Sequence, residues 1–213
     1  MAKRPAIAPR KQPVQARSHA TVEAILQATV RVLTKVGYDR TSTNKVAEAA
    51  GVSVGSLYQY FPSKEALAVA LAERYHERLF AVMFERLREV ATLPIHDAVR
   101  SVIWAIVDAH RADPVVHRIL TEQIPRIGKL GEILKDIEVR ATPIVRQYLE
   151  ARQREIRVKD LDAAAYVVVV TVQVLADRIS HNKDPLELSR RVDATCELVS
   201  RYLVDDNAER KRS

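Results

Sequence analysis

The sequence predicts an all-α fold of about nine helices, on three observations. After residue 17, apolar residues recur every three or four positions along most of the chain, which is the spacing of one helix face. No region alternates convincingly between apolar and polar residues at every second position, as a half-buried strand would. Glycine occurs only 5 times in 213 residues, too rarely for a fold rich in strands and turns.

The composition is that of a globular protein with a sizeable core. Hydrophobic residues make up 47% and charged residues 29%, and the length predicts one or two small domains. The single cysteine, Cys196, excludes an internal disulfide and a cysteine-based zinc site within one chain. No targeting segment is evident, and the longest apolar stretch, residues 163–176, is too short to cross a bilayer. We therefore expect a cytoplasmic protein without a membrane partner or a cofactor.

The chain begins with an arm and a first helix. Residues 1–17 hold three prolines and five cations and cannot bury enough apolar surface to fold, so we expect a flexible basic arm. An apolar row at helical spacing then runs from Val22 to Val36. Gly37 follows directly and is expected to end this helix.

Two short helices come next. The second helix is expected to open with Thr41 or Ser42 as its N-cap and to end at Gly51. The third is expected to open at Ser53. It ends before Pro62, because a proline biases the preceding residue away from helical geometry.

Capping residues and prolines divide the rest of the chain. Ser63 is expected to cap a long helix that runs to about Val90. Later helix starts are marked by Pro94, by Asp113-Pro114 and by Asp184-Pro185. Pro143 either kinks a helix or marks its start, and the sequence leaves both possibilities open. Residues 206–213 are expected to form a flexible tail.

The net charge of +7 is confined to the first third of the chain. Residues 1–64 hold ten Lys/Arg and three Asp/Glu, so the remaining 149 residues are electrically balanced. This asymmetry is typical of a nucleic-acid-binding domain joined to a neutral partner domain. A basic tail that only aids solubility is the alternative.

Residues 41–61, TSTNKVAEAAGVSVGSLYQYF, match the pattern of a DNA-binding helix-turn-helix. Gly51 can adopt the positive φ of the tight turn between the helices. On the second helix Val54, Leu57 and Phe61 are expected to face the core. The opposite face carries short or hydrogen-bonding residues suited to phosphates and base edges, namely Ser53, Gly55, Ser56, Gln59 and Tyr60. An ordinary helical hairpin with a polar surface is the alternative.

The same stretch contains a pattern typical of an enzyme. Residues 51–55 fit the G-x-S-x-G motif of serine hydrolases, which requires a strand before the serine. Here a strong helix former precedes Ser53, so we interpret Ser53 as a helix N-cap. We expect no catalytic residues and no enzyme.

Residues 20–67, above all GYDRTSTNKVAEAAGVSVGSLYQYFPSKEAL, resemble the N-terminal domain of the TetR (tetracycline repressor) family of transcriptional regulators. Tyr60 departs from the family pattern, since many members carry histidine there. The resemblance implies a three-helix DNA-binding domain over residues 18–64 and a helical effector-binding and dimerisation domain over residues 65–205. It also implies that double-stranded DNA, as a palindromic operator, is the partner.

The resemblance assigns DNA contacts residue by residue. Phosphate contacts are implied for Thr41, Ser42, Ser53, Tyr58, Tyr60 and Lys64. Positions nearest the bases are implied for Thr43, Lys45, Val54, Gly55, Ser56 and Gln59. Whether Gln59 reads adenine or bonds a phosphate is open, as is whether the basic arm enters a minor groove or stays unbound.

Residues 161–179 carry two adjacent apolar rows, so this helix must be buried on more than one side. The first row follows 4-3-4-3-4 spacing and the second consists of Ala163, Val167, Val170 and Val174. A second copy of the chain is the simplest further partner, and the resemblance agrees, because family members dimerise through their last two long helices. The interface is predicted from the first row and the last helix: Leu161, Ala165, Val168, Val172, Leu175, Ile179, Val192 and Val199. A core helix buried wholly within one chain is the alternative.

The resemblance also implies a small-molecule effector in the C-terminal domain, expected to be largely apolar. Candidate contacts are polar or amphipathic residues on helices bordering the interior: Trp104, His110, Gln123, Tyr148, Tyr166 and Gln173. Plain core packing for Trp104, and a surface or core position for each of the others, are the alternatives. His110 and His117 invite a metal site, but Pro114 breaks the helix they would have to share, so no metal is predicted.

We therefore predict a homodimeric transcriptional repressor released by its effector. A regulator of this kind without an effector, and a small helical enzyme or adaptor, are the alternatives.

Overall fold

The computed structural model describes residues 16–124 and 129–204, and all regular structure within these ranges is helical. The α-helices are α1 (Ala16–Val36), α2 (Thr43–Ala50), α3 (Val54–Tyr60), α4 (Lys64–Glu89), α5 (Ile95–Ala112), α6 (Pro114–Arg118), α7 (Lys129–Ala151), α8 (Leu161–Ser180) and α9 (Pro185–Leu203). A π-helical turn, η1 (Ile119–Gln123), follows α6. The all-α prediction is confirmed. The arm predicted for residues 1–17 and the tail predicted for 206–213 lie outside the described residues, except that residues 16 and 17 begin α1.

Local capping sets the boundaries of the first three helices as the sequence predicts. Gly37 follows α1 with φ 76°, and Gly51 follows α2 with φ 68°, both in the left-handed region that glycine adopts at little cost. Ser42 is the N-cap of α2, and its hydroxyl accepts a hydrogen bond from the Lys45 N–H at 3.4 Å. Ser53 caps α3 in the same way.

Prolines behave less uniformly. Asp184 caps α9 and Pro185 is its first residue, as predicted. Pro94 instead occupies the N-cap position of α5, so that helix begins one residue later than expected. Pro143 lies inside α7, which begins well before it, so Pro143 does not mark the start of the helix.

The chain divides into two compact units. Unit 1 comprises residues 1–76 and 114–133, and unit 2 comprises residues 77–113 and 134–213. The predicted boundary between residues 64 and 65 is therefore not where the units divide, since the first half of α4 and the segment 114–133 belong to unit 1.

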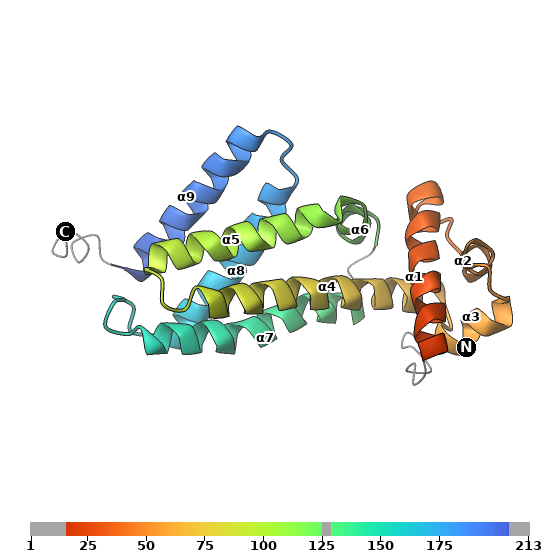
Figure 1. Cartoon of the computed structure of the whole chain (residues 1–213), viewed down its shortest axis with the longest axis horizontal. Coiled ribbons are helices and arrows are strands. Elements are labelled where there is room, and N and C mark those ends of the chain that lie inside the picture. The colour runs from red at the N-terminus through yellow and green to blue at the C-terminus, as the bar shows by residue number, and fades with distance from the viewer. Residues whose placement is uncertain (1–15, 125–128, 205–213) are drawn as a thin grey trace, which may run out of the picture. The chain divides into compact units, whose positions relative to one another are not determined.

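Unit 1 is built around the helix-turn-helix, with α1 packed on α2 and α2 on α3 (Figure 1). Its core takes side chains from α1, α2, α3 and the first turn of α4, and Ile25, Val46, Leu57 and Phe61 are all at most 2% exposed. Leu57 and Phe61 are thus in the core as their spacing predicts, whereas Val54 is not.

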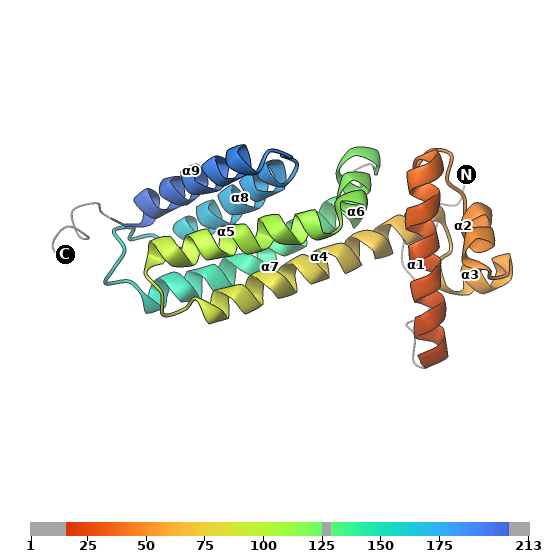
Figure 2. The same cartoon turned by 45° about the horizontal axis from the view of Figure 1, so that its top comes forward.

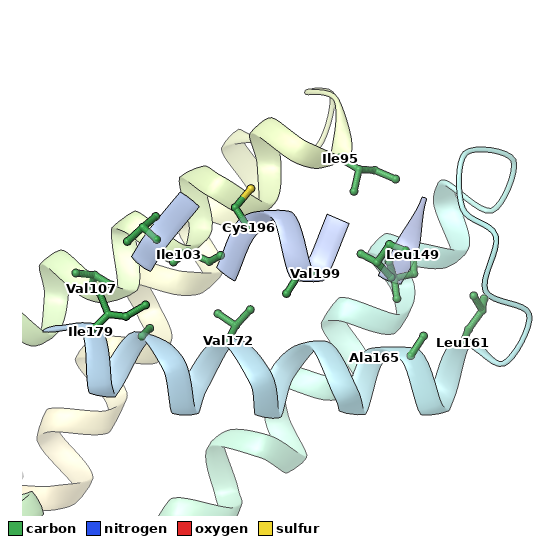
Figure 3. Packing of buried hydrophobic residues seen from close by; sticks show 14 of the residues in the cluster. Ile95, Ile103, Val107, Leu149, Leu161, Ala165, Val172, Ile179, Cys196 and Val199 are labelled. Carbon is green, nitrogen blue, oxygen red and sulfur yellow. The ribbon is translucent and has the colours of Figure 1, made fainter. Parts of the chain in front are cut away.

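Unit 2 is a helical bundle in which α5, α8 and α9 pack against one another (Figure 2). Val172 and Ile179 of α8 project from that helix toward α9, where Cys196 and Val199 lie (Figure 3). Cys196 is fully buried, and burial is the main cause that raises the pKa of its thiol. It therefore behaves as a small apolar core residue.

Candidate nucleic-acid interface

The turn between α2 and α3 is held by backbone hydrogen bonds and by one serine. The Val52 N–H donates to the Ala47 carbonyl at 3.0 Å across the left-handed Gly51. The Ser53 hydroxyl accepts from the Ser56 N–H at 3.0 Å and lies 2.8 Å from the Ser56 hydroxyl. Ser53 therefore serves as a helix cap, and a helix rather than a strand precedes it, so the G-x-S-x-G pattern forms no nucleophile elbow.

The short helix α3 packs on the core through a single buried residue. Leu57 is fully buried, and Phe61 follows it at 2% exposure. Val54, predicted to face the core, is 39% exposed, because it is the first residue of α3 and its side chain leans past the start of the helix. The exposed residues of this region are Ser53, Val54, Gly55, Tyr58 and Gln59, with Ser56 and Tyr60 half-buried. The predicted polar face is therefore open to solvent.

Two predicted DNA contacts lie behind this surface. Thr41 is 5% exposed, and its hydroxyl donates to the Gly37 carbonyl at 2.7 Å. Thr43 is 8% exposed, and its hydroxyl lies 3.1 Å from the hydroxyl of Tyr58, which is itself 41% exposed. This hydrogen bond joins α2 to α3. Thr43 is thus in a position to orient Tyr58 and is not itself presented to bases.

The lysines predicted to meet DNA are bonded to carbonyls of the turn between α1 and α2. Lys45 Nζ donates to the Arg40 carbonyl at 2.7 Å. Lys64 Nζ donates to the Tyr38 and Asp39 carbonyls at 3.3 and 3.4 Å and lies 4.6 Å from the centre of the Tyr38 ring. Lys45 therefore ties this turn to α2, and Lys64 ties it to the first residue of α4.

Tyr38 of this turn and Arg31 of α1 also make contacts that stabilise the helix-turn-helix, and the sequence did not predict either contact. Burial, with smaller contributions from Glu65 and Asp39, raises the pKa of Tyr38 to about 12, so its hydroxyl is neutral under Lys64. Arg31 Nη2 donates to the Ala49 carbonyl at 2.8 Å, near the C-terminal end of α2. These contacts join residues 18 or more positions apart, so no local signal predicts them.

The candidate effector contacts differ in burial. Trp104 and Tyr148 are half-buried and pack against the core of unit 2, and Arg152 Nη1 donates to the Tyr148 hydroxyl at 3.0 Å. His110 is buried and Gln173 is half-buried. Tyr166 is 50% exposed on α8, so it does not line an interior. Gln123 belongs to unit 1, where its buried Oε1 has no hydrogen-bond partner among the described residues.

The apolar row of α8 predicted to meet a second copy is packed inside the chain's own core. Leu161, Ala165, Val172 and Ile179 are each at most 9% exposed, and Val168 and Leu175 pack against the same cluster. Val192 and Val199 of α9 are buried with them (Figure 3 shows Val199). The other row is outside, with Val167 at 40% and Val174 at 51% exposure. A second copy would therefore meet this outer row.

α8 is long and apolar enough, by length and composition, to cross a membrane, although its apolar stretch was expected to be too short. α8 contributes many residues to the core of unit 2, and 44% of its most apolar 18-residue segment is buried inside the protein. Buried core helices of soluble proteins are often as long and as apolar, so the length and composition of α8 are weak evidence for a membrane span.

Comparison with known proteins places both parts of the chain in one family. The family described as "Bacterial regulatory proteins, tetR family" matches residues 25–71, and "Tetracyclin repressor-like, C-terminal domain" matches residues 94–203. The nucleoid occlusion factor SlmA of Haemophilus ducreyi is 32% identical over 117 residues, which is 55% of each chain. The match therefore spans about half the length of that relative.

Solved structures share the fold at low identity. A TetR-family transcriptional regulator from Mesorhizobium loti aligns with a TM-score of 0.71 and 18% identity, covering 89% of this chain and 100% of the other. The regulator FadR from Bacillus subtilis, solved in complex with stearoyl-CoA, aligns with a TM-score of 0.66 and 20% identity, covering 84% and 98%. At these identities the alignments establish the fold alone.

Proposed function

The chain belongs to the TetR family of bacterial regulatory proteins, and from this premise we propose that it is an effector-released transcriptional repressor acting as a homodimer in the cytoplasm. The family consists of DNA-binding transcription regulators that are not enzymes. The observation that carries the DNA-binding role is the outer face of α3, on the side away from the buried Leu57. This face is exposed, uncharged and rich in hydrogen-bonding groups.

The proposed DNA surface keeps most of the predicted contacts and gives two threonines a different role. Ser42, Ser53, Tyr58, Tyr60 and Lys64 are proposed to contact phosphates. Lys45, Val54, Gly55, Ser56 and Gln59 are proposed to lie nearest the bases. Thr41 and Thr43 support this surface from behind, because both are buried and hydrogen-bonded within unit 1.

Dimerisation is proposed through the outer row of α8, defined as Ala163, Val167, Val170 and Val174, together with exposed Leu198 of α9. Exposed apolar side chains in continuous rows are uncommon on monomers and mark interfaces. A two-fold dimer presents two copies of α3 to half-sites about 34–36 Å apart or a multiple of that distance, which requires a palindromic operator.

The effector is proposed to be a largely apolar small molecule bound in the domain that follows the helix-turn-helix. The support is the stearoyl-CoA found with FadR and the half-buried, amphipathic side chains of Trp104 and Tyr148 in unit 2. Gln123 belongs to unit 1 and is left out of the proposed site. His110 and Gln173 remain in the proposed set. Tyr166 is reassigned to the outer face of α8, because half of it is exposed.

The test is a salt titration of duplex binding by the full chain, using an operator selected from a random duplex pool. Lys64 keeps one ammonium N–H beyond the two carbonyls that it bonds, which can meet a phosphate. Lys64→Ala is expected to weaken binding to all duplexes and to reduce the slope of log affinity against log salt by about one. Exposed Lys35 lies outside the proposed surface, so Lys35→Ala serves as a control that removes the same charge and should keep the slope. An unchanged slope for Lys64→Ala rejects its phosphate role, and a protein that ignores every duplex at low salt rejects the function.

A second candidate is a DNA-binding factor of this family that organises DNA without an effector. The similarity to SlmA, a nucleoid occlusion factor, favours it. The two candidates separate when the protein–operator complex is titrated with stearoyl-CoA and shorter acyl-CoAs. Release from the operator supports the repressor, and binding unaffected by the whole series supports the second candidate.

A further inference from the structure

The geometry of α3 singles out two positions on its outer face. Successive helical residues are rotated by about 100°, so Gly55 and Gln59 lie within about 20° of the direction opposite Leu57. Leu57 is the buried residue of α3, and Gly55 and Gln59 are exposed. Val54 with Tyr58, and Ser56 with Tyr60, flank this outermost line on its two sides. A helix that enters a groove with this face forward brings Gly55 and Gln59 closest to the groove floor, and the flanking residues closest to its walls.

Among the exposed hydrogen-bonding side chains of α3, Gln59 is the one whose groups are not used by the part of the chain that the structure describes. The hydroxyls of Ser53 and Ser56 lie 2.8 Å apart and bond each other, and the Tyr58 hydroxyl is bonded to Thr43. The exposed Gln59 amide makes no hydrogen bond within residues 16–124 and 129–204. None of the seven residues of α3 is charged, so the cationic side chains that pair with guanine are missing from this helix.

Gly55 is a glycine that the protein's own packing does not require. Its φ is not in the left-handed region, which only Gly37 and Gly51 occupy among the described residues. A methyl group added at Gly55 would meet only the Ser53 hydroxyl, at 3.9 Å, an ordinary contact. Because helical side chains lean toward the N-terminus, the Gln59 side chain extends along the line of Gly55, one turn earlier. The missing side chain leaves space there for a closely approaching ligand.

We propose that Gln59 is a specificity-determining residue that reads an adenine of the operator in the major groove, with Gly55 as the point of closest approach. This inference rests on the proposed DNA-binding function. An amide offers one donor and one acceptor side by side, which match N7 and the N6 amino group of adenine, whereas guanine presents two acceptors. The outermost position of Gln59 favours a base over a phosphate, because phosphates line the groove walls.

The experiment uses the full chain and the operator it selects from a random duplex pool. Each adenine of a half-site is replaced in turn by 7-deazaadenine, which removes the N7 acceptor and keeps the Watson–Crick pair. At one position, wild-type affinity is expected to fall about 5- to 150-fold, and Gln59→Ala, already weaker, should bind both duplexes equally. Gln59→Arg, selected against the same pool, should prefer guanine at that position.

Gly55→Ala supplies an independent readout, because its effects on folding and binding have opposite signs. The thermal midpoint should rise, since alanine favours the helix over glycine, while operator affinity falls at least tenfold. The inference is overturned if no adenine position loses its sensitivity to 7-deazaadenine in Gln59→Ala, if Gln59→Arg keeps the wild-type base preference, or if Gly55→Ala binds as tightly as wild type. If wild type selects no duplex at all, the proposed function falls, and the inference falls with it.

Discussion

The helices α3 and α8 bury their side chains in opposite ways. α3 has seven residues of which only Leu57 is buried, whereas α8 has twenty with eight buried. In α3 most neighbours of Leu57 are polar, so the sequence itself marks the inner face. In α8 the inner residue Val172 and the outer residue Val174 are both valines, so composition does not distinguish the faces. Where the two faces of a helix differ in polarity, the sequence shows which face is buried. Where both faces are apolar, as in α8, the packing of helices from distant parts of the sequence determines which face is buried.

The variant with the largest expected effect places a charge on the buried row of α8, which includes Val172. Val172 is 7% exposed within the core of unit 2, so Val172→Asp buries a carboxylate without a partner. We expect unit 2 to lose on the order of 4 kcal/mol of unfolding free energy, read from the urea midpoint followed by circular dichroism. A midpoint equal to that of wild type would contradict the assignment of this row to the core.

The parts of the molecule that sequence predicted well are those set by neighbouring residues. The left-handed glycines Gly37 and Gly51 and the serine caps Ser42 and Ser53 act within one helical turn, so residue type and position suffice. The all-α class and the exposed face of α3 follow from the same local patterns.

The parts that sequence missed depend on contacts between distant segments. Nothing near Thr43 in the sequence indicates its hydrogen bond to Tyr58, 15 residues away, and nothing near Lys64 indicates that it bonds the carbonyl of Tyr38. Pro143 shows the same limit, because α7 continues through it although proline removes one helical hydrogen bond. The packing of Leu149 into the core of unit 2 stabilises the helix beyond that proline.

A charge on the outer row of α8 is the matched control for the first variant and tests the interface itself. Val174 is 51% exposed and two residues from Val172, so Val174→Asp leaves its carboxylate in water in a single chain. The fold should keep its urea midpoint when measured on the monomer. The dimer dissociation constant should rise about 30-fold or more, which corresponds to about 2 kcal/mol at a central interface position. Sedimentation over a concentration series measures this constant, and a dimer as tight as wild type would place the interface elsewhere.

The variant with the smallest expected effect tests whether the buried Thr43 of α2 orients Tyr58 on the exposed face of α3. Thr43→Val removes the hydroxyl that bonds Tyr58, which should cost about 1 kcal/mol of stability and weaken operator binding, while Thr43→Ser keeps the hydroxyl and should bind like wild type. If Thr43 acts only by orienting Tyr58, then Tyr58→Phe weakens binding, and adding Thr43→Val to it costs less than Thr43→Val costs alone. Operator affinities of wild type, the two single variants and the double variant complete this cycle. Fully additive losses would mean that Thr43 supports DNA binding by a route other than Tyr58.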